Sequence, residues 1–333
     1  MAGMIPVVST ALQTADRLGA LKVRWNIGRM SYAIPPRLYA VGNPGADSPV
    51  LVTANYKLTF DRLRQELSGL NAWLLVLDTQ GVNVWCAAGK GTFGTDELVR
   101  RIEAVHLGDV VTHRTLLLPQ LGAPGVAAPE VRQRSGFGVV YGPVYAQDIR
   151  AFLAAGMVAT PAMRRVHFKL MDRLAVIPVE LTAWFPYWLL LTALLCLAAG
   201  FLGGGWGRSG GVTLLSGLAF LAGGAVVPAL LPWIPGRAFA AKGAVVGVLL
   251  AYAIFASGMA TRLCGVRSSL ELAAWWLLLP VITSFLALNF TGATTFTSQS
   301  GVKYEMRFAM PILAAGLIAG LGLFAAAQMG GGR

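Results

Sequence analysis

A single cysteine in the first half of the chain lies in the segment with the clearest chemical potential. This segment reads Asn-Val-Trp-Cys-Ala-Ala-Gly-Lys over residues 83–90, so Cys86 follows an aromatic residue and precedes two alanines and a glycine. A thiolate is a nucleophile and a ligand for soft metals. The small residues after Cys86 would leave a surface that can lie flat against a wide planar ligand.

Two phosphate-binding motifs are excluded for this segment. A Walker loop needs a glycine five residues before its final Gly-Lys pair, where this sequence has Val84, and a Ser or Thr where it has Gly91. A dinucleotide fingerprint would need GxGxxG, which is missing here. The thiol is therefore the group that could do chemistry.

Two interpretations of Cys86 stay open on the residues alone. A cysteine can simply pack as a small apolar side chain. Alternatively, a helical turn from Val84 would bring Lys90, four residues on, near the sulfur and favour its thiolate form. The segment also follows a predicted buried strand, and ligands of open parallel sheets bind beyond the carboxyl ends of strands.

The eight residues of the motif resemble those of a known family. Asn83 to Lys90 match the motif of the HgcA family, the membrane-bound corrinoid proteins of mercury methylation, and resemble the corrinoid domain of the corrinoid iron–sulfur protein. Two further segments, residues 52–59 and 142–144, are similar to family segments. A cytoplasmic Rossmann-like domain followed by five membrane spans also agrees with this family.

The resemblance implies roles for individual residues. In the family the motif forms a cap helix over the corrin ring, and its cysteine is the proposed lower axial ligand of cobalt. Carried over, Cys86 is the cobalt ligand and the catalytic residue, and the corrinoid (cobalamin) contacts are Asn83, Val84, Trp85, Cys86, Ala87, Ala88, Gly89, Lys90, Thr53 and Thr59.

The resemblance further implies a cobalamin-dependent methyltransferase. It would transfer a methyl group from methyl-Co(III) to Hg(II) and form methylmercury, with a methyl donor protein or a methylated folate as the source. A thiolate donates more charge to cobalt than an imidazole does, which eases loss of the methyl group toward a soft metal. Two electrons must then regenerate Co(I), and the resemblance implies an HgcB-type ferredoxin with two [4Fe–4S] clusters as their donor.

Other polar residues carry weaker indications. The three histidines are isolated and share no ligand spacing, so we expect ordinary surface or core roles for them. Cys196 and Cys264 lie in or beside apolar windows, where small apolar packing is the default. Asp78 could hydrogen-bond corrin amides or merely end a strand. Three distant cysteines without a CxxC pair indicate neither a disulfide framework nor a self-contained iron–sulfur or zinc site.

Elements that could position Cys86 are predicted between residues 37 and 155. Apolar runs at residues 38–41, 50–52, 72–77, 115–118 and 138–141 alternate with helical patterns, which predicts a parallel sheet flanked by helices. The helices are expected at residues 57–67 behind a Thr59 cap, from Thr95 on, and at residues 147–153. This pattern predicts an α/β Rossmann-like corrinoid-binding domain.

The second half of the sequence predicts an all-α membrane domain. The chain is 56% hydrophobic and only 13% charged, with a mean hydropathy of +0.63. Five charge-free windows exceed the roughly 18 residues of a spanning candidate. We expect a domain at residues 1–165, a basic juxtamembrane linker at 166–182, and a transmembrane domain at 183–333 with helices at about 183–203, 211–231, 241–261, 271–290 and 308–328.

The basic residues predict the orientation of this membrane domain. If five spans alternate, eight Lys and Arg residues fall on the side of the N-terminal domain and four on the other side. This bias places the N-terminal domain in the cytoplasm of a bacterium or archaeon and the spans in its cytoplasmic membrane. The net charge of +12 is then a matter of topology rather than of nucleic-acid binding.

Two alternative functions remain. The same domain and motif would serve a corrinoid methyl carrier in one-carbon metabolism whose acceptor is not mercury. A transporter with a sensory cytoplasmic domain is the other, but coupled transporters place ionisable side chains inside their spans and the five windows contain none.

Overall fold

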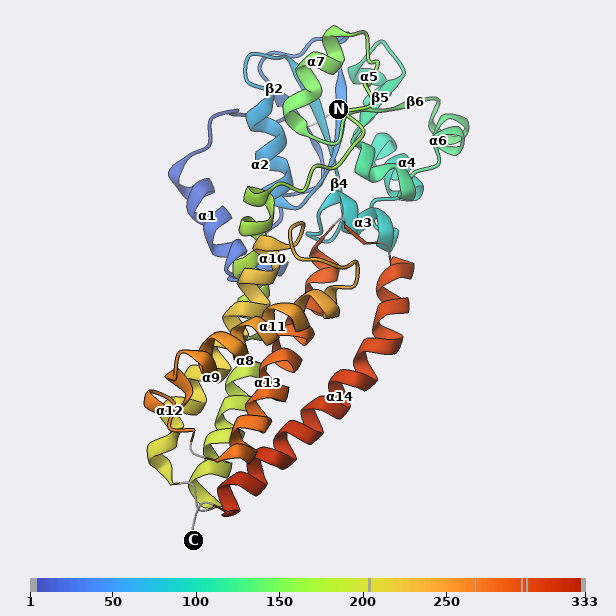
Figure 1. Cartoon of the computed structure of the whole chain (residues 1–333). Coiled ribbons are helices and arrows are strands. Elements are labelled where there is room, and N and C mark those ends of the chain that lie inside the picture. The colour runs from blue at the N-terminus through green and yellow to red at the C-terminus, as the bar shows by residue number, and fades with distance from the viewer. Residues whose placement is uncertain (1–4, 203–204, 267, 295, 298, 331–333) are drawn as a thin grey trace. The chain divides into compact units, whose positions relative to one another are not determined.

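The computed structural model describes residues 5–202, 205–266, 268–294, 296–297 and 299–330 (Figure 1). The chain divides into two compact units. One runs to His167, except for Arg24–Asn26, and the other begins at Phe168. The sequence prediction of an α/β domain followed by an all-helical region with five candidate membrane spans is confirmed.

The first unit is built on a six-stranded sheet. Its strands are β1 (Val7–Val8), β2 (Leu38–Val41), β3 (Val50–Ala54), β4 (Ala72–Leu77), β5 (Thr115–Leu118) and β6 (Gly138–Tyr141), in the order β1-β2-β4-β3-β5-β6. The prediction of a purely parallel sheet is wrong, because β2 pairs with β4 in the antiparallel sense. Residues 42–49, which connect β2 to β3, are too few for the helical crossover that parallel strands need.

Helices cover both faces of this sheet. The helical elements are α1 (Thr14–Arg24), η1 (Arg29–Ser31), α2 (Lys57–Glu66), α3 (Val84–Lys90), α4 (Thr95–Ala104), α5 (Leu107–Val110), η2 (Gln120–Gly125), α6 (Ala128–Ser135), η3 (Ala146–Asp148) and α7 (Ile149–Ala154). Side chains alternate along β3, so Val50 and Val52 pack with α3, α4 and α6, whereas Leu51 packs with α2 and α7. Figure 1 shows α2 and α4 on opposite sides of the strands.

Helix α2 begins at residue 57 as expected, but its expected cap needs a correction. Thr59 was expected to cap this helix, but the N-cap is Tyr56 and Thr59 lies inside the first turn. The backbone turns into the helix directly after the bridge between Ala33 and Tyr56, whereas the first buried side chain of the helix is Phe60. A cap placed directly before Phe60 was therefore three residues too late.

An ionic cluster ties α1 to α2. Asp16 accepts hydrogen bonds from Lys57 Nζ at 2.5 Å and from Arg64 at 2.7 Å, and both cations also pair with Asp61. Partial burial alone would raise the pKa of Asp16, but these hydrogen bonds, with one to the Gln13 amide, outweigh it and lower that pKa from 3.8 to about 2. The cluster therefore holds α1 in place through a charged Asp16.

The second unit is a bundle of helices. They are α8 (Leu170–Phe201), η4 (Trp206–Arg208), α9 (Ser209–Leu221), the π-helical segment η5 (Ala222–Val226), α10 (Val227–Leu230), α11 (Phe239–Ala256), α12 (Met259–Arg262), α13 (Ser269–Asn289), η6 (Phe290–Ala293) and α14 (Gln299–Gly330). The five candidate spans are Leu170–Phe201, Trp206–Leu230, Phe239–Ala256, Ser269–Gly292 and Ser300–Gly330. They suggest a membrane protein.

Two of these helices begin earlier than the charge-free windows do. Helix α8 starts at Leu170, inside the segment expected as a linker, and α14 includes Lys303, Glu305 and Arg307. Charged side chains at a span's end can reach the headgroup region while the backbone stays helical. The end expected at residue 203 lies outside the described residues.

Charged residues just outside the windows are buried between the helices. Arg173 donates to the carbonyl of Ala229 at 3.2 Å, and Lys242 donates to that of Leu231 at 2.5 Å. Both cations thus satisfy carbonyls at the end of α10, where the second span stops. At another place Arg208 donates to Glu271 at 3.2 Å and to Gln328 at 3.0 Å, which links η4, α13 and α14.

Candidate functional site around Cys86

The predicted motif forms its own short helix, α3, with a defined start and end. Asn83 is the N-cap, and its side-chain oxygen accepts a hydrogen bond from the backbone N–H of Cys86 at 2.9 Å. The helix ends at Gly91, whose φ of +82° is the left-handed conformation that glycine adopts without strain. Asn83 and Gly91 therefore fix the helix that carries the thiol.

One face of α3 is anchored in the core. Val84, Ala87 and Ala88 are buried and belong to the apolar cluster beneath the sheet. Next to them, a Cβ added at Gly125 would lie 3.0 Å from Ala88 Cα and 2.1 Å from the Phe93 carbonyl oxygen. The α3 backbone thus packs directly against η2, and this close approach requires glycine at position 125.

The other face of α3 is open. Trp85 is 39% exposed, Cys86 is half-buried, and Gly89 and Lys90 are exposed. Within the described part of the chain, no hydrogen bond reaches Cys86 Sγ. This face offers one accessible thiol beside an aromatic ring and a position without a side chain.

The loop before α3 is held by Asn55, which follows β3. The Asn55 side-chain oxygen accepts from the backbone N–H groups of Thr79 at 3.1 Å and of Gly81 at 3.0 Å. Asn55 also donates to Asp78 at 3.2 Å. One amide side chain therefore fixes the turn that leads from β4 to the motif.

Asp78 stabilises the turn between β4 and α3 through hydrogen bonds. Its carboxylate accepts from Asn55 and from the backbone N–H of Gln80 at 3.1 Å, and its own N–H donates to the buried Glu97 at 2.8 Å. Glu97 also pairs with Arg101 at 2.8 Å. The structure thus gives Asp78 the strand-ending role that was one of its two predicted roles.

The carboxyl ends of three parallel strands meet around this site. Asn55 follows β3, the turn to α3 follows β4, and η2 follows β5. The chain leaves β3 toward one face of the sheet, with α2, and leaves β5 toward the other, with α6. Such a divergence is where open α/β sheets bind ligands.

Two predicted contact residues lie elsewhere. Thr53 is buried in β3, where alternation turns its side chain to the face opposite that of Val52 and Ala54, which pack in the cluster of α3. Thr59 lies in the first turn of α2, the helix that covers that opposite face. The structure thus brings together Asn83 to Lys90, but not these two threonines.

The histidines and the other cysteines have different surroundings. His106 precedes α5 with a φ of +47°, His113 Nε2 lies 2.9 Å from the Ser48 carbonyl oxygen, and His167 stacks on Tyr145. Cys196 and Cys264 belong to the helical unit. Among the described residues, no three His, Cys, Asp or Glu side chains are grouped so that they could hold a metal ion.

Sequence reasoning missed Asn55, Glu97 and Gly125 as residues that position the site. Asn55 had a signal, since it directly follows a predicted buried strand at the edge where the motif lies. Glu97 lies in the first turn of the helix expected from Thr95 on, and that position gives no sign that its carboxylate accepts from the Asp78 N–H after β4. Gly125 gave no signal, because its role depends on a packing contact between segments far apart in sequence.

Comparisons with known proteins give relatives for the first unit. The model of the CO dehydrogenase/acetyl-CoA synthase delta subunit family matches residues 13–153. The gamma subunit of the acetyl-CoA decarbonylase/synthase complex of Archaeoglobus fulgidus is 32% identical over 138 residues, which are 40% of this chain and 29% of that protein. The subunit from Methanocaldococcus jannaschii is 32% identical over 127 residues, or 38% of this chain and 26% of the relative.

A further relative is the large subunit of the corrinoid/iron–sulfur protein of Moorella thermoacetica. It is 28% identical over 128 residues, which are 38% of this chain and 28% of that protein. The chain thus spans less than a third of the length of these relatives. The first unit is related to these proteins, and the family-model match ends at residue 153, before the five apolar helices begin.

Proposed function

We propose that this chain is a membrane-bound, corrinoid-dependent methyltransferase of the HgcA type, whose acceptor is Hg(II) and whose product is methylmercury. The observation that carries the proposal is Cys86 on the open face of α3, within the eight-residue motif that resembles this family. The relatives of the first unit support the corrinoid part, because one of them is named as a corrinoid/iron–sulfur protein.

The residues around Cys86 fit a corrinoid in shape and in donor chemistry. A wide planar ring needs a surface without protruding side chains, and α3 offers the exposed Gly89 with the buried alanines behind it. A bound corrinoid would supply a cobalt centre that accepts and donates methyl groups. The Cys86 thiolate would be a soft, anionic ligand for this cobalt.

The chain's own residues would orient and hold this ligand. Asn83 fixes the first turn of α3 through the Cys86 N–H, so the backbone that carries the Cys86 side chain is held in place. Trp85 offers an exposed indole for packing, and Lys90 an exposed ammonium for amide groups at a ring's edge. Val84, Ala87 and Ala88 support the helix from below.

Mercury is proposed as the acceptor because charge donated by a thiolate favours giving a methyl group to a soft, electron-poor metal ion. An HgcB-type ferredoxin with two [4Fe–4S] clusters is the proposed electron donor, and a methylated folate or a methyl donor protein the proposed source of the methyl group. The bias of basic residues supports a cytoplasmic first unit and spans in the cytoplasmic membrane.

A second candidate is a corrinoid methyl carrier that serves a non-mercury acceptor. The relatives favour it, since several are named as subunits of acetyl-CoA decarbonylase/synthase complexes. The open face of α3 would serve either acceptor. The two candidates differ in whether mercury receives the methyl group.

A methylation assay in cells separates them. Cells that lack the gene are complemented with the wild-type chain, with Cys86→Ala, or with Cys196→Ala as a matched control in the helical unit. They are then given isotopically labelled Hg(II), and labelled methylmercury is measured by mass spectrometry. We expect production with the wild type and the control, and a loss of at least about tenfold with Cys86→Ala. Methylmercury at the wild-type level with Cys86→Ala would refute the proposal.

A further inference from the structure

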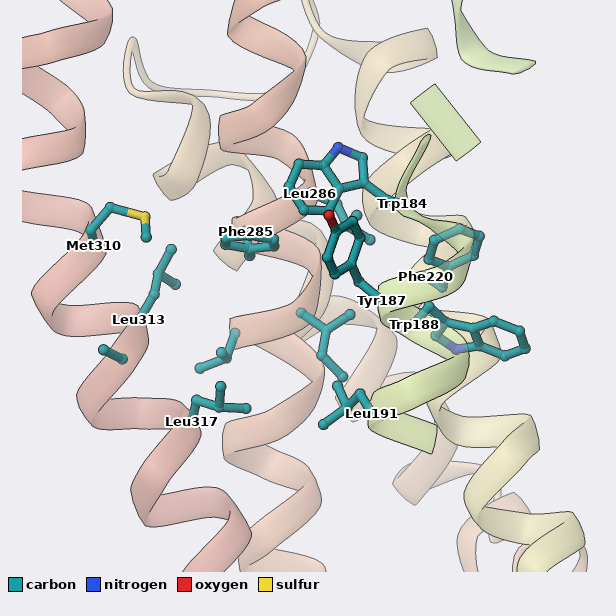
Figure 2. Close-up of a pocket in the computed structure, with 13 residues that line it drawn as sticks. Trp184, Tyr187, Trp188, Leu191, Phe220, Phe285, Leu286, Met310, Leu313 and Leu317 are labelled. Carbon is teal, nitrogen blue, oxygen red and sulfur yellow. The ribbon is translucent and has the colours of Figure 1, made fainter. Parts of the chain in front are cut away.

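The helical unit contains an apolar pocket between α8, α13 and α14. Its volume is about 310 Å³, in the range of small-molecule sites. Figure 2 shows side chains of α8 and α14 on either side of the space, with Phe285 of α13 between them. The lining residues used below are Trp184, Tyr187, Met310, Ala314 and Leu317.

The pocket opens away from the bundle. Trp184 packs edge-on against Phe285, with ring centroids 5.0 Å apart, and both side chains line the pocket. Tyr187 is 65% exposed and Met310 is 37% exposed, so the outer rim is open. If these helices span a bilayer, lipid is what faces this opening.

Polar atoms gather at one end of the pocket. Figure 2 shows the indole nitrogen of Trp184 and the hydroxyl of Tyr187 at the end where Met310 lies, while Leu191 and Leu317 lie at the other end. Indole and phenol groups prefer the boundary between headgroups and hydrocarbon. The Met310 end is therefore the end suited to ester and glycerol oxygens.

Two cations extend the pocket-lining face of α14 beyond that end. Lys303 and Arg307 precede Met310, Ala314 and Leu317 at spacings of four, three, four and three residues, which place all five on one face of the helix. Both cations are exposed. Arg307 lies about 4.5 Å along the axis from Met310, one helical turn from the pocket.

The acidic residue between these cations is engaged elsewhere. Glu305 accepts a hydrogen bond from the backbone N–H of Ala240, at the start of α11, at 2.7 Å. Its carboxylate therefore leaves Lys303 and Arg307 available for an external anion. This end of α14 carries positive charge directly beside an apolar slot.

We propose that the α8–α14 groove is a binding site for one anionic phospholipid from the surrounding bilayer. Its phosphate pairs with Lys303 and Arg307, its ester oxygens lie near Trp184 and Tyr187, and one acyl chain fills the pocket. From Met310 to Leu317 the slot is about 10 Å long, within the roughly 15 Å of one leaflet's hydrocarbon. The proposal is independent of the corrinoid.

A transmembrane helix of a partner matches the groove less well in charge. An apolar helix could cover the apolar lining, but it would leave Lys303 and Arg307 beyond the Met310 end without an anion. A quinone would fit the apolar part but would leave the two cations without a counter-charge.

Native mass spectrometry of the full-length protein in mild detergent tests the site. The protein is titrated with phosphatidylglycerol and, separately, with phosphatidylcholine of the same acyl chains. Ala314→Trp fills the pocket, and Ile318→Trp, at a 71% exposed position on the same helix, is the matched control. We expect one tightly held phosphatidylglycerol, at least about tenfold weaker binding with Ala314→Trp, and a change below about twofold with the control.

The charge requirement has its own variant in case a pocket substitution disturbs folding. Replacing both exposed cations, Lys303→Gln with Arg307→Gln, should bring phosphatidylglycerol binding down to the phosphatidylcholine level, whereas Arg237→Gln should not. Equal binding of the two lipids by the wild type would overturn the proposal. Unchanged phosphatidylglycerol binding in the double variant would also overturn it. So would a quinone that displaces the lipid equally well from the wild type and from the double variant.

Discussion

Replacing Gly125 by alanine tests whether η2 holds α3 by direct backbone packing. The added Cβ would lie 2.1 Å from the Phe93 carbonyl oxygen and 3.0 Å from Ala88 Cα. Both are backbone atoms, so no side-chain rotation can relieve the overlap. Overpacking of this kind costs about 1–3 kcal/mol, and here the cost falls on the contact that supports Cys86.

Hydrogen exchange of the full-length protein measures this cost where it arises. A loss of about 1–3 kcal/mol that is confined to local opening raises the exchange rate of α3 amides by about 5- to 150-fold. Gly45→Ala is the matched control, because nothing lies within 4 Å of the Cβ it would add and its φ is not in the left-handed region. We expect its effect to stay within about 0.5 kcal/mol.

If Gly125→Ala leaves exchange in α3 at the level of Gly45→Ala, then η2 does not support the helix. Faster exchange spread over the whole first unit, with α3 no more affected than β4, would also contradict a local role for Gly125.

Three further predictions concern other contacts. Asn83→Ala removes the acceptor for the Cys86 N–H and should destabilise α3 by about 1 kcal/mol. Hydrogen exchange of the first α3 amides should become faster, and an unchanged exchange rate would contradict the capping role. Because the pKa of Asp16 is lowered to about 2, its stabilising effect is complete above about pH 4 and is lost as the pH falls toward 2. Asp16→Asn should therefore flatten the acid-induced loss of stability in this window, and an unchanged acid profile would contradict it. In the bundle, Glu271→Leu leaves Arg208 without its carboxylate and should cost about 3–5 kcal/mol, measured as a lower Tm, whereas a double Glu271→Leu and Arg208→Met variant should recover much of that loss.

Much of the first unit could be predicted from its apolar pattern. The strands at residues 38–41, 72–77, 115–118 and 138–141 have the expected bounds, because each is a short buried run between polar or turn residues. The antiparallel pairing of β2 was missed, since pairing direction depends on how residues 42–49 connect the strands and not on the strand residues themselves.

The helical unit shows where charge is a poor guide to helix ends. Apolar length predicted five candidate spans, and the structure has five helices long and apolar enough for that role, but α8 begins well before its charge-free window. Arg173 is tolerated in that helix because the carbonyls of Phe168 and Ala229 accept its N–H groups. Such compensation lies in tertiary contacts that the sequence does not display.

The site itself was predictable as a motif but not as a geometry. The order from Asn83 to Lys90 predicted a helical turn with small residues, and α3 has it. That Ala87 and Ala88 face the core while Cys86 stays accessible follows from how α3 packs against η2. Thr53 was included on resemblance alone, and alternation in β3 turns it to the other face of the sheet.

The visible absorption spectrum of the purified full-length protein, reconstituted with cobalamin, tests the central claim most directly. If Cys86 ligates cobalt, the bound cobalamin should show bands that differ from those of free cobalamin. Cys86→Ala should abolish that difference, and Cys196→Ala should keep it. Failure of the wild-type protein to retain cobalamin, or identical spectra for the wild type and Cys86→Ala, would contradict the account.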